Sequence, residues 1–365
     1  MNEKLLYRNP STEKVEVKEF SANLPYRQWV KNPEGVIELK EFAGSAQLGN
    51  LRIADPILTT IAQGYPEIKN LIGDILFPSV RVAKESGRFP AFGKECFVIP
   101  TSIKRSVGGR VERMTIQQGW VQISLSEYAL GFDIDNREIN EWAGASGQIL
   151  TTRQRYLDNK IALVREQNQM TLATTDTLYA SGFSLSGASK AWATTGDAMR
   201  DMLQLIALVR KTNNQQPDVV WFTPTAWYLY CNNVSVKTSI KYGGTPEKPA
   251  QLYVGGEAAV AQSLGVAKVV VAWASYAYGS EGGFNQTPAT MDYLWESING
   301  ACAGAMVTGL GWGVPSFGYT YERLNSPIVE SWYDNAVTSM KYDTEHFFDS
   351  AITKNDGGAM YYELA

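Results

Sequence analysis

The sequence contains one histidine, His346, so any catalytic scheme that needs an imidazole must use it. Its neighbours Asp343, Glu345 and Asp349 could join it in an acid–base or metal-binding cluster. A site with several histidine ligands is excluded within one chain. Scattered carboxylates near a C-terminus more often belong to a solvated strand or turn, and we expect that arrangement here.

A second group of carboxylates could supply the paired acids of a glycosidase: Asp133, Asp135, Glu138 and Glu141. The first two alternate with Phe132 and Ile134, which is typical of a strand with polar side chains on one face and apolar side chains on the other. The run then leads into a predicted helical turn, where acidic residues favour the N-terminus. We therefore expect a structural role for these acids.

The sequence offers no site for a cofactor. Neither the P-loop pattern nor G-x-G-x-x-G occurs, so no phosphate cradle is predicted. The 3 cysteines, Cys96, Cys231 and Cys302, are far apart and lack the spacing of a zinc knuckle, so we expect buried, reduced thiols. We expect no metal, no cofactor and no enzymatic activity.

Charge and hydropathy give no support to two further classes, dedicated nucleic-acid binders and membrane-spanning proteins. With 33 basic and 37 acidic side chains, the net charge of −4 does not indicate a dedicated nucleic-acid binder. No apolar stretch is long enough to span a bilayer. The densest basic cluster surrounds Gly108 and Gly109, and it comprises Lys104, Arg105, Arg110 and Arg113.

These glycines predict a turn between two long extended runs, from Arg81 to about Asp135. On the return run Val121, Ile123 and Leu125 share one face, whereas Leu130, Phe132 and Ile134 have the opposite phase. One bulge near residues 126–128 would produce this shift. Such a ribbon cannot bury both faces within its own subunit, so we expect it to pack on something else.

Other elements follow from local patterns. About 50 N-terminal residues show no sustained period and predict an extended arm. Asp55-Pro56 predicts a helix start, and a long amphipathic helix is expected from Ile149 to Tyr179. From residue 197 the pattern becomes α/β, with buried strands at Val219–Phe222 and Val266–Ala272, and short strands follow residue 315.

This order of elements resembles the major capsid proteins of tailed bacteriophages, which have the Hong Kong 97-type capsid fold. Several phrases carry the resemblance: Ala54–Tyr65, Ile72–Val82, Tyr128–Asp135, Pro315–Tyr321 and Asp349–Tyr361. It implies an α+β chain built from an N-terminal arm (1–53), a first peripheral part (54–82), an extended β-hairpin loop (83–135), a peripheral part with the spine helix (136–195), an axial domain (196–325) and C-terminal peripheral strands (326–365).

The resemblance also implies a function. Such a chain self-assembles into pentamers and hexamers of the icosahedral head around double-stranded DNA, with only non-specific contact to the DNA. Its expected partners are itself, scaffolding and portal proteins and a decoration protein, with no membrane. It is expected to be assembled in the host bacterial cytoplasm and to reside in the virion. Two alternatives are an encapsulin-like compartment shell and an α/β enzyme centred on residues 197–275.

The residues expected to contact neighbouring subunits lie on the β-hairpin loop: Arg88, Lys104, Arg105, Gly108, Gly109, Arg110, Arg113 and Trp120. The basic tip has two interpretations. It could dock on an acidic patch of the next subunit, or it could be an exposed hairpin end whose charges resist edge-to-edge aggregation.

Overall fold

The computed structural model describes residues 3–8, 15–20, 27–31, 37–41, 53–54, 58–59, 62, 70–91, 98–99, 104–105, 107–108, 111, 113, 119–141, 146–243, 256–278, 290–309 and 315–364. The chain divides into two compact units. One comprises residues 1–55, 132–146 and 330–342, and the other comprises the remaining residues. Among the described residues no helix is both long and apolar enough to cross a membrane.

The N-terminal segment contains two antiparallel strand pairs. β1 (Glu3–Arg8) pairs with β2 (Val15–Phe20), and β3 (Arg27–Lys31) pairs with β4 (Ile37–Glu41). The sequence predicted an extended arm here, without individual strands. Each strand has only five or six residues, so its alternation is too short to appear as a sustained period.

A six-stranded sheet forms the first of two larger sheets. Its path runs β5-β17-β18-β16-β6, and β9 also pairs with β18. The bounds are β5 (Ile53–Ala54), β6 (Ser79–Val82), β9 (Ser126–Asp135), β16 (Gly318–Arg323), β17 (Ile328–Asp334) and β18 (Ser339–Ile352). Because β16 pairs in parallel with β6 and antiparallel with β18, the sheet is mixed.

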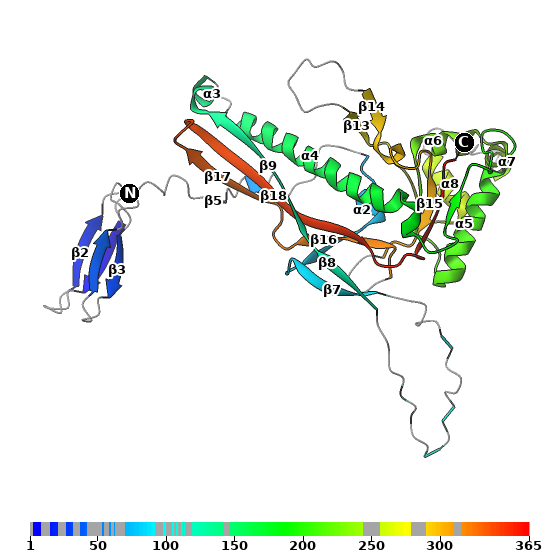
Figure 1. Ribbon diagram of the computed structural model, residues 1–365, viewed down its shortest axis with the longest axis horizontal. Helices are drawn as coiled ribbons and strands as arrows, with labels where there is room; N and C mark the ends of the chain where they lie inside the picture. Colours follow the sequence, from blue (N-terminus) through cyan, green and yellow to red (C-terminus); the bar gives the residue numbers. More distant parts are fainter. Residues whose placement is uncertain are drawn as a thin grey trace. The chain divides into compact units, whose positions relative to one another are not determined.

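The longest helix, α4 (Ser146–Thr174), has 29 residues and therefore extends about 44 Å. Figure 1 shows it running alongside β18, and a hydrogen bond of 2.8 Å from Gln154 Nε2 to Thr344 Oγ1 joins the two. The predicted end at Tyr179 was wrong. The helix ends at Thr174, whose hydroxyl donates a hydrogen bond to the Met170 carbonyl and whose own carbonyl accepts one from Asn299 Nδ2. A 3-10 turn, η3 (Asp176–Leu178), follows.

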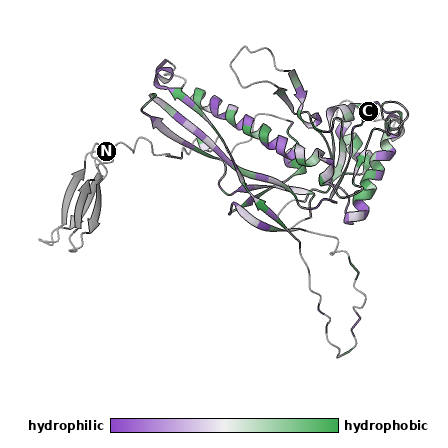
Figure 2. Ribbon diagram, in the orientation of Figure 1, coloured by the Kyte–Doolittle hydropathy of each residue, from purple (hydrophilic) through white to green (hydrophobic). Residues whose placement is uncertain are grey.

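A five-stranded sheet, in the order β10-β19-β15-β11-β12, forms the centre of the α/β part. The strands are β10 (Ser184–Ser186), β11 (Val219–Phe222), β12 (Lys268–Val271), β15 (Ala303–Met306) and β19 (Gly358–Tyr362). Four helices accompany it: α5 (Ala198–Asn213), α6 (Pro224–Asn232), α7 (Val234–Gly243) and α8 (Gly256–Leu264). The expected α/β pattern is thus confirmed, and Figure 2 shows hydrophobic and hydrophilic residues alternating around α5.

Two strands pair differently from their expected grouping. β19 was grouped with the C-terminal peripheral strands, but it pairs with β15 and β10 in the five-stranded sheet. β16 was grouped with the axial segment, but it pairs with β6 and β18. In β19 residues 358–361 are all buried, as expected for a strand covered on both faces, so its place follows from non-local packing.

The remaining elements are short. They are α2 (Gly73–Leu76), β7 (Ser86–Ala91), β8 (Gly119–Ser124), α3 (Asn136–Glu141), β13 (Ser275–Tyr278), β14 (Thr290–Tyr293) and the 3-10 turn η4 (Leu294–Glu296). Of the helix predicted after Asp55-Pro56, only Leu58, Thr59 and Ala62 lie in the described part, and all three are helical. Its predicted end at Gly64 lies outside the described residues.

Candidate interaction surface and polar junction

The base of the predicted ribbon is an antiparallel pair, β7 with β8, in which Arg88 lies opposite Gln122 and Phe89 opposite Val121. The inner face packs on β16, where the Phe89 and Tyr321 rings lie 4.6 Å apart between centroids. Side chains alternate along each strand, so Arg88 and Trp120 belong to the opposite face. Both are exposed, and 59% of Trp120 is accessible to solvent.

The predicted change of phase on the return run is confirmed. Val121, Ile123 and Leu125 are less exposed than their neighbours, and then both Ser126 and Glu127 are exposed. From Tyr128 onward the shielded positions are the even-numbered ones. The break between β8 and β9 therefore keeps apolar side chains on one face along both strands.

The ribbon tip is described only at scattered positions. Lys104, Arg105 and Arg113 are exposed, and Gly108 has a φ of +80° in a turn, as the sequence predicted. Gly109 and Arg110 lie outside the described residues. Four aliphatic side chains of the ribbon are also exposed, with relative exposures of 65% or more: Val98, Ile99, Val107 and Val111. That these positions contact a neighbouring subunit stays a prediction.

The structure does not bring together the carboxylates that could have joined His346 in an acid–base or metal-binding cluster. This residue lies on β18, and strand alternation directs Asp343, Glu345 and Asp349 to the opposite face. The expectation of a solvated site was also wrong for the imidazole, because its Nε2 atom is buried without a hydrogen-bond partner among the described residues. Burial, with a contribution from the Arg165 charge, lowers the pKa of His346 to about 4.

The acidic run on β9 and α3 has the expected strand arrangement. Asp133 and Asp135 are exposed, whereas Ile134 is buried, and the Phe132 ring stacks on Tyr342 with centroids 5.0 Å apart. The Asp135 carboxylate accepts a hydrogen bond of 2.8 Å from the Arg137 amide at the start of α3. Of the cysteines, Cys231 and Cys302 are free and buried as predicted, and Cys96 lies outside the described residues. Within the described part of the chain no histidine, cysteine or acidic groups gather as a metal site.

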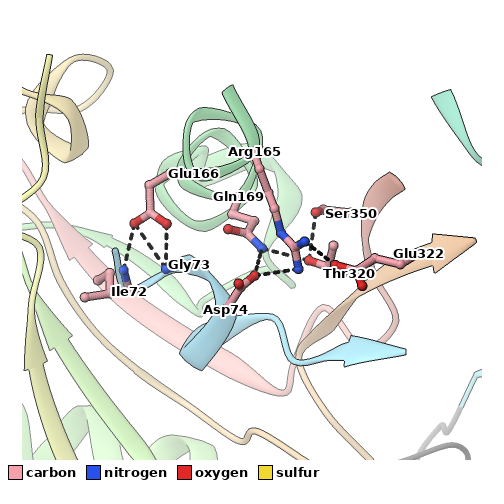
Figure 3. A network of polar contacts seen from close by, with 9 residues as sticks. All are labelled: Ile72, Gly73, Asp74, Arg165, Glu166, Gln169, Thr320, Glu322 and Ser350. Atoms are coloured by element: carbon pink, nitrogen blue, oxygen red, sulfur yellow. Dashed lines mark hydrogen bonds and ion pairs between the residues drawn. The ribbon is translucent and has the colours of Figure 1, made fainter. Parts of the chain in front are cut away.

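A buried polar junction on one turn of α4 was not predicted from the sequence. Glu166 is 1% exposed, and its Oε1 atom accepts hydrogen bonds from the Ile72 amide at 2.9 Å and from Trp295 Nε1 at 2.7 Å. Its Oε2 atom accepts from the Gly73 amide at 2.9 Å. Figure 3 shows this carboxylate directed at the start of α2. One side chain thus connects α4, α2 and η4.

The same turn of α4 also contacts β16. Arg165 forms ion pairs with Asp74, at 2.7 Å, and with Glu322. Gln169 Nε2 donates to Asp74 Oδ1 at 2.9 Å and to Thr320 Oγ1 at 2.8 Å. Figure 3 shows these contacts on the other side of the turn from Glu166. A cavity of about 430 Å³ adjoins the junction and is lined by these charged groups and by His346.

Burial of Glu166 raises the pKa of its carboxyl to about 7, although the two amides and the Trp295 indole lower it in part. A weak signal for this residue exists in the sequence. Met170 and Ala173 follow Glu166 at helical spacings of four and seven, and both are buried, so a charged residue shares their face.

Comparisons with known proteins cover most of the chain. No family model matches the sequence. The major capsid protein of Burkholderia phage BcepMu is 25% identical over 319 residues, which cover 82% of this chain and 94% of that protein.

Two solved structures share the fold. A phage-related protein from Bordetella bronchiseptica RB50 has a TM-score of 0.66 at 21% identity and covers 86% of this chain and 98% of its own. The putative capsid protein of a prophage from E. coli CFT073 has a TM-score of 0.53 at 11% identity, and the match covers 85% of this chain and 99% of that protein. Of the functions considered from the sequence, that of a phage major capsid protein is the one these comparisons support. The expected resemblance is therefore confirmed: the chain is similar over most of its length to a phage major capsid protein and has the mixed helix-and-sheet fold of phage-related structures.

Proposed function

We propose that this chain forms the icosahedral head of a tailed phage by assembling into pentamers and hexamers in the Hong Kong 97-type arrangement. The observation that carries the proposal is the sequence similarity to a phage major capsid protein, which extends over 82% of this chain and 94% of the relative. A domain inserted into an unrelated protein would share only part of its length.

The ribbon supplies the physical mechanism. Trp120 and the four exposed aliphatic residues of the ribbon present apolar side chains to water, and a neighbouring subunit that covers them would remove this apolar area from water. A two-stranded ribbon is marginally stable by itself, so covering its outer face with a neighbouring subunit would stabilise both partners. Identical subunits in closed symmetry reuse one such contact many times, so individually modest contacts give a stable shell.

The basic tip has a place in this scheme. Lys104, Arg105 and Arg113 are exposed, so they can reach acidic side chains of another copy and guide its approach. The same charges discourage edge-to-edge pairing of ribbons before assembly. The proposed contact set consists of these three basic residues together with Arg88, Gly108, Gly109, Arg110 and Trp120.

The remaining roles follow from the capsid assignment. The segment 1–53 is the arm, residues 83–135 form the extended loop, and the α/β part belongs to the axial domain. The chain acts with scaffolding, portal and decoration proteins, is assembled in the host bacterial cytoplasm and resides in the virion. It has no enzymatic role, a proposal supported by the separation of His346 from the nearby carboxylates.

Deletion of residues 102–113 tests the role of the ribbon. We expect the shortened chain to remain a folded, soluble subunit that forms no closed shells, because every tip residue in the described part of this segment is exposed. A second variant replaces Lys104, Arg105 and Arg113 with glutamine and keeps the loop length, so it separates the loss of the basic charges from the loss of the ribbon tip. Shells of normal size from the deleted chain, seen by electron microscopy, would refute this role.

The contents of the particles separate a phage head from an encapsulin-like compartment. Neighbouring genes for terminase and portal, with DNA inside native particles, fit the proposal. A neighbouring cargo enzyme, packaged without DNA, would transfer the assignment to a compartment shell.

A further inference from the structure

The β13–β14 hairpin has one face that is largely apolar and open to solvent. Ala277 lies opposite Met291 and Ser275 lies opposite Tyr293, so these four side chains share a face. Trp273 joins them, because its ring packs edge-on against Tyr293 with 6.3 Å between the centroids. The exposed fractions are 41% for Trp273, 60% for Met291 and 42% for Tyr293. These five residues form the hairpin face.

The opposite side of the hairpin is held by its own subunit. Tyr276 alternates with the residues of the hairpin face and packs against the core of the α/β part. A hydrogen bond of 2.9 Å from the Leu294 amide to the Ala274 carbonyl fixes the base of the hairpin. The apolar side therefore stays directed at solvent. Tryptophan, tyrosine and methionine are residue types that are enriched in contacts between proteins.

A second apolar surface of the α/β part is concave. It is a groove of about 490 Å³, which Met199, Leu203 and Ala207 line from α5 and Ser235 lines from α7. Leu203 is 41% exposed, and Val234, next to Ser235 in the chain, is 72% exposed. This surface is the α5 groove. A projecting hairpin and a groove, both partly apolar, are complementary in shape and in chemistry.

The hairpin face and the α5 groove lie on different parts of one subunit. Figure 1 shows β13–β14 and α5 apart from each other. A contact between two different surfaces of identical subunits is heterologous, and it closes into a ring when the rotation between neighbours divides a full turn. The pentamers and hexamers proposed above are rings of this kind.

We propose that the hairpin face of one copy docks in the α5 groove of the next copy, and that this heterologous contact closes the ring of subunits. The inference rests on the proposed function, from which it takes a second copy of the chain as the partner. The apolar anchors fill the groove, and Asp197 and Arg200, which also line it, supply a polar rim.

Trp273 gives the expected size of the effect. An aromatic side chain buries roughly 150–250 Å², so at 41% exposure about 60–100 Å² of it remain for a neighbour to cover. Replacing Trp273 with alanine should therefore weaken the contact between two copies roughly 10–60-fold. A stable contact covers about 800 Å² of each partner, and the ribbon contributes to that area as well.

Mixing two charge variants tests the proposal. Met291→Glu disables the hairpin face, and Leu203→Glu disables the α5 groove. Each variant alone should remain a folded subunit by circular dichroism and form no pentamers or hexamers in sedimentation velocity. An equal mixture should form dimers, because the intact hairpin of Leu203→Glu meets the intact groove of Met291→Glu. These dimers should not grow, since both of their outer surfaces are disabled.

A cysteine pair tests the same contact without adding a charge. The chain that carries both Met291→Cys and Leu203→Cys should form disulfide-linked ladders of subunits when assembled samples are oxidised. Met291→Cys alone should add no link beyond those of the wild type treated in the same way. Links from this single variant would reveal a contact between two hairpins and would overturn the proposal.

Leu178→Glu is the matched control, because Leu178 is 39% exposed and belongs to neither surface. This variant should form the same rings as the wild type. The proposal is overturned if the mixture of charge variants yields no dimers, or if Leu178→Glu loses its rings as completely as Met291→Glu. Normal rings from Met291→Glu would refute this inference and leave the capsid assignment intact. A wild type without rings or particles would refute the proposed function, and this inference with it.

Discussion

Trp120 provides a direct test of how the ribbon contributes to assembly. Its side chain lies on the outer face of β8 and is 59% exposed. The apolar contacts of the ribbon base are made on the other face, by Phe89, Val121 and Ile123 with Tyr321. Replacing Trp120 with alanine should therefore leave the free subunit folded and weaken only the contact between subunits.

The size of the effect can be worked out from the exposed area. An aromatic side chain buries roughly 150–250 Å² when it is fully covered. At 59% exposure, about 90–150 Å² remain for a neighbour to cover. At about 25 cal/mol per Å² the covered area contributes ~2–4 kcal/mol to one contact. Because each 1.4 kcal/mol is about a factor of ten, the threshold concentration for assembly should rise at least ~30-fold.

Light scattering across a concentration series measures this threshold, and urea denaturation of the unassembled subunit measures its stability. Trp120→Phe, which keeps most of the apolar area, should have a threshold between those of the wild type and Trp120→Ala. An unchanged threshold in Trp120→Ala would refute the reasoning. So would a loss of subunit stability of the same size, because it would place Trp120 in the core.

Three further predictions concern the folded subunit. Phe317→Ala should lower the free energy of unfolding by about 3–5 kcal/mol, because this buried ring packs on Phe77 and Tyr179, and urea denaturation measures the loss. Gly304→Ala should cost about 1–3 kcal/mol in the same assay, since a Cβ atom would lie 2.4 Å from Trp221 Nε1; a variant as stable as the wild type would contradict that contact. The pKa of His346 is lowered from 6.5 to about 4, so its neutral form stabilises the subunit above 6.5 and this contribution is lost as pH falls to 4. Unfolding midpoints measured from pH 7 to 4 should therefore fall less in His346→Gln than in the wild type, and equal slopes would refute the assignment.

Features that depend on neighbours in sequence were predictable. The phase shift before Tyr128 follows from which residues are apolar, and the α/β pattern follows from short buried runs such as Val219–Phe222. The long amphipathic helix was expected, but hydropathy alone does not decide which of its residues are buried. Val164 is 36% exposed, whereas Gln154 and Gln169 are buried because they bond Thr344 and Thr320.

Features set by distant partners were not predictable. Glu166 looks like any surface acid of a helix until Ile72 and Trp295 are placed beside it. The pairing of β19 with β15 joins residues more than 50 positions apart. The hydropathy pattern of a single chain also cannot show what covers Trp120, because the partner proposed for this side chain is another copy of the chain.

Sedimentation velocity of the purified chain, at several concentrations, tests the central claim most directly. The capsid assignment predicts megadalton particles, or discrete pentamers and hexamers that grow with concentration. A monomer or dimer whose size is independent of concentration, and that persists when a scaffolding protein is co-expressed, would contradict it.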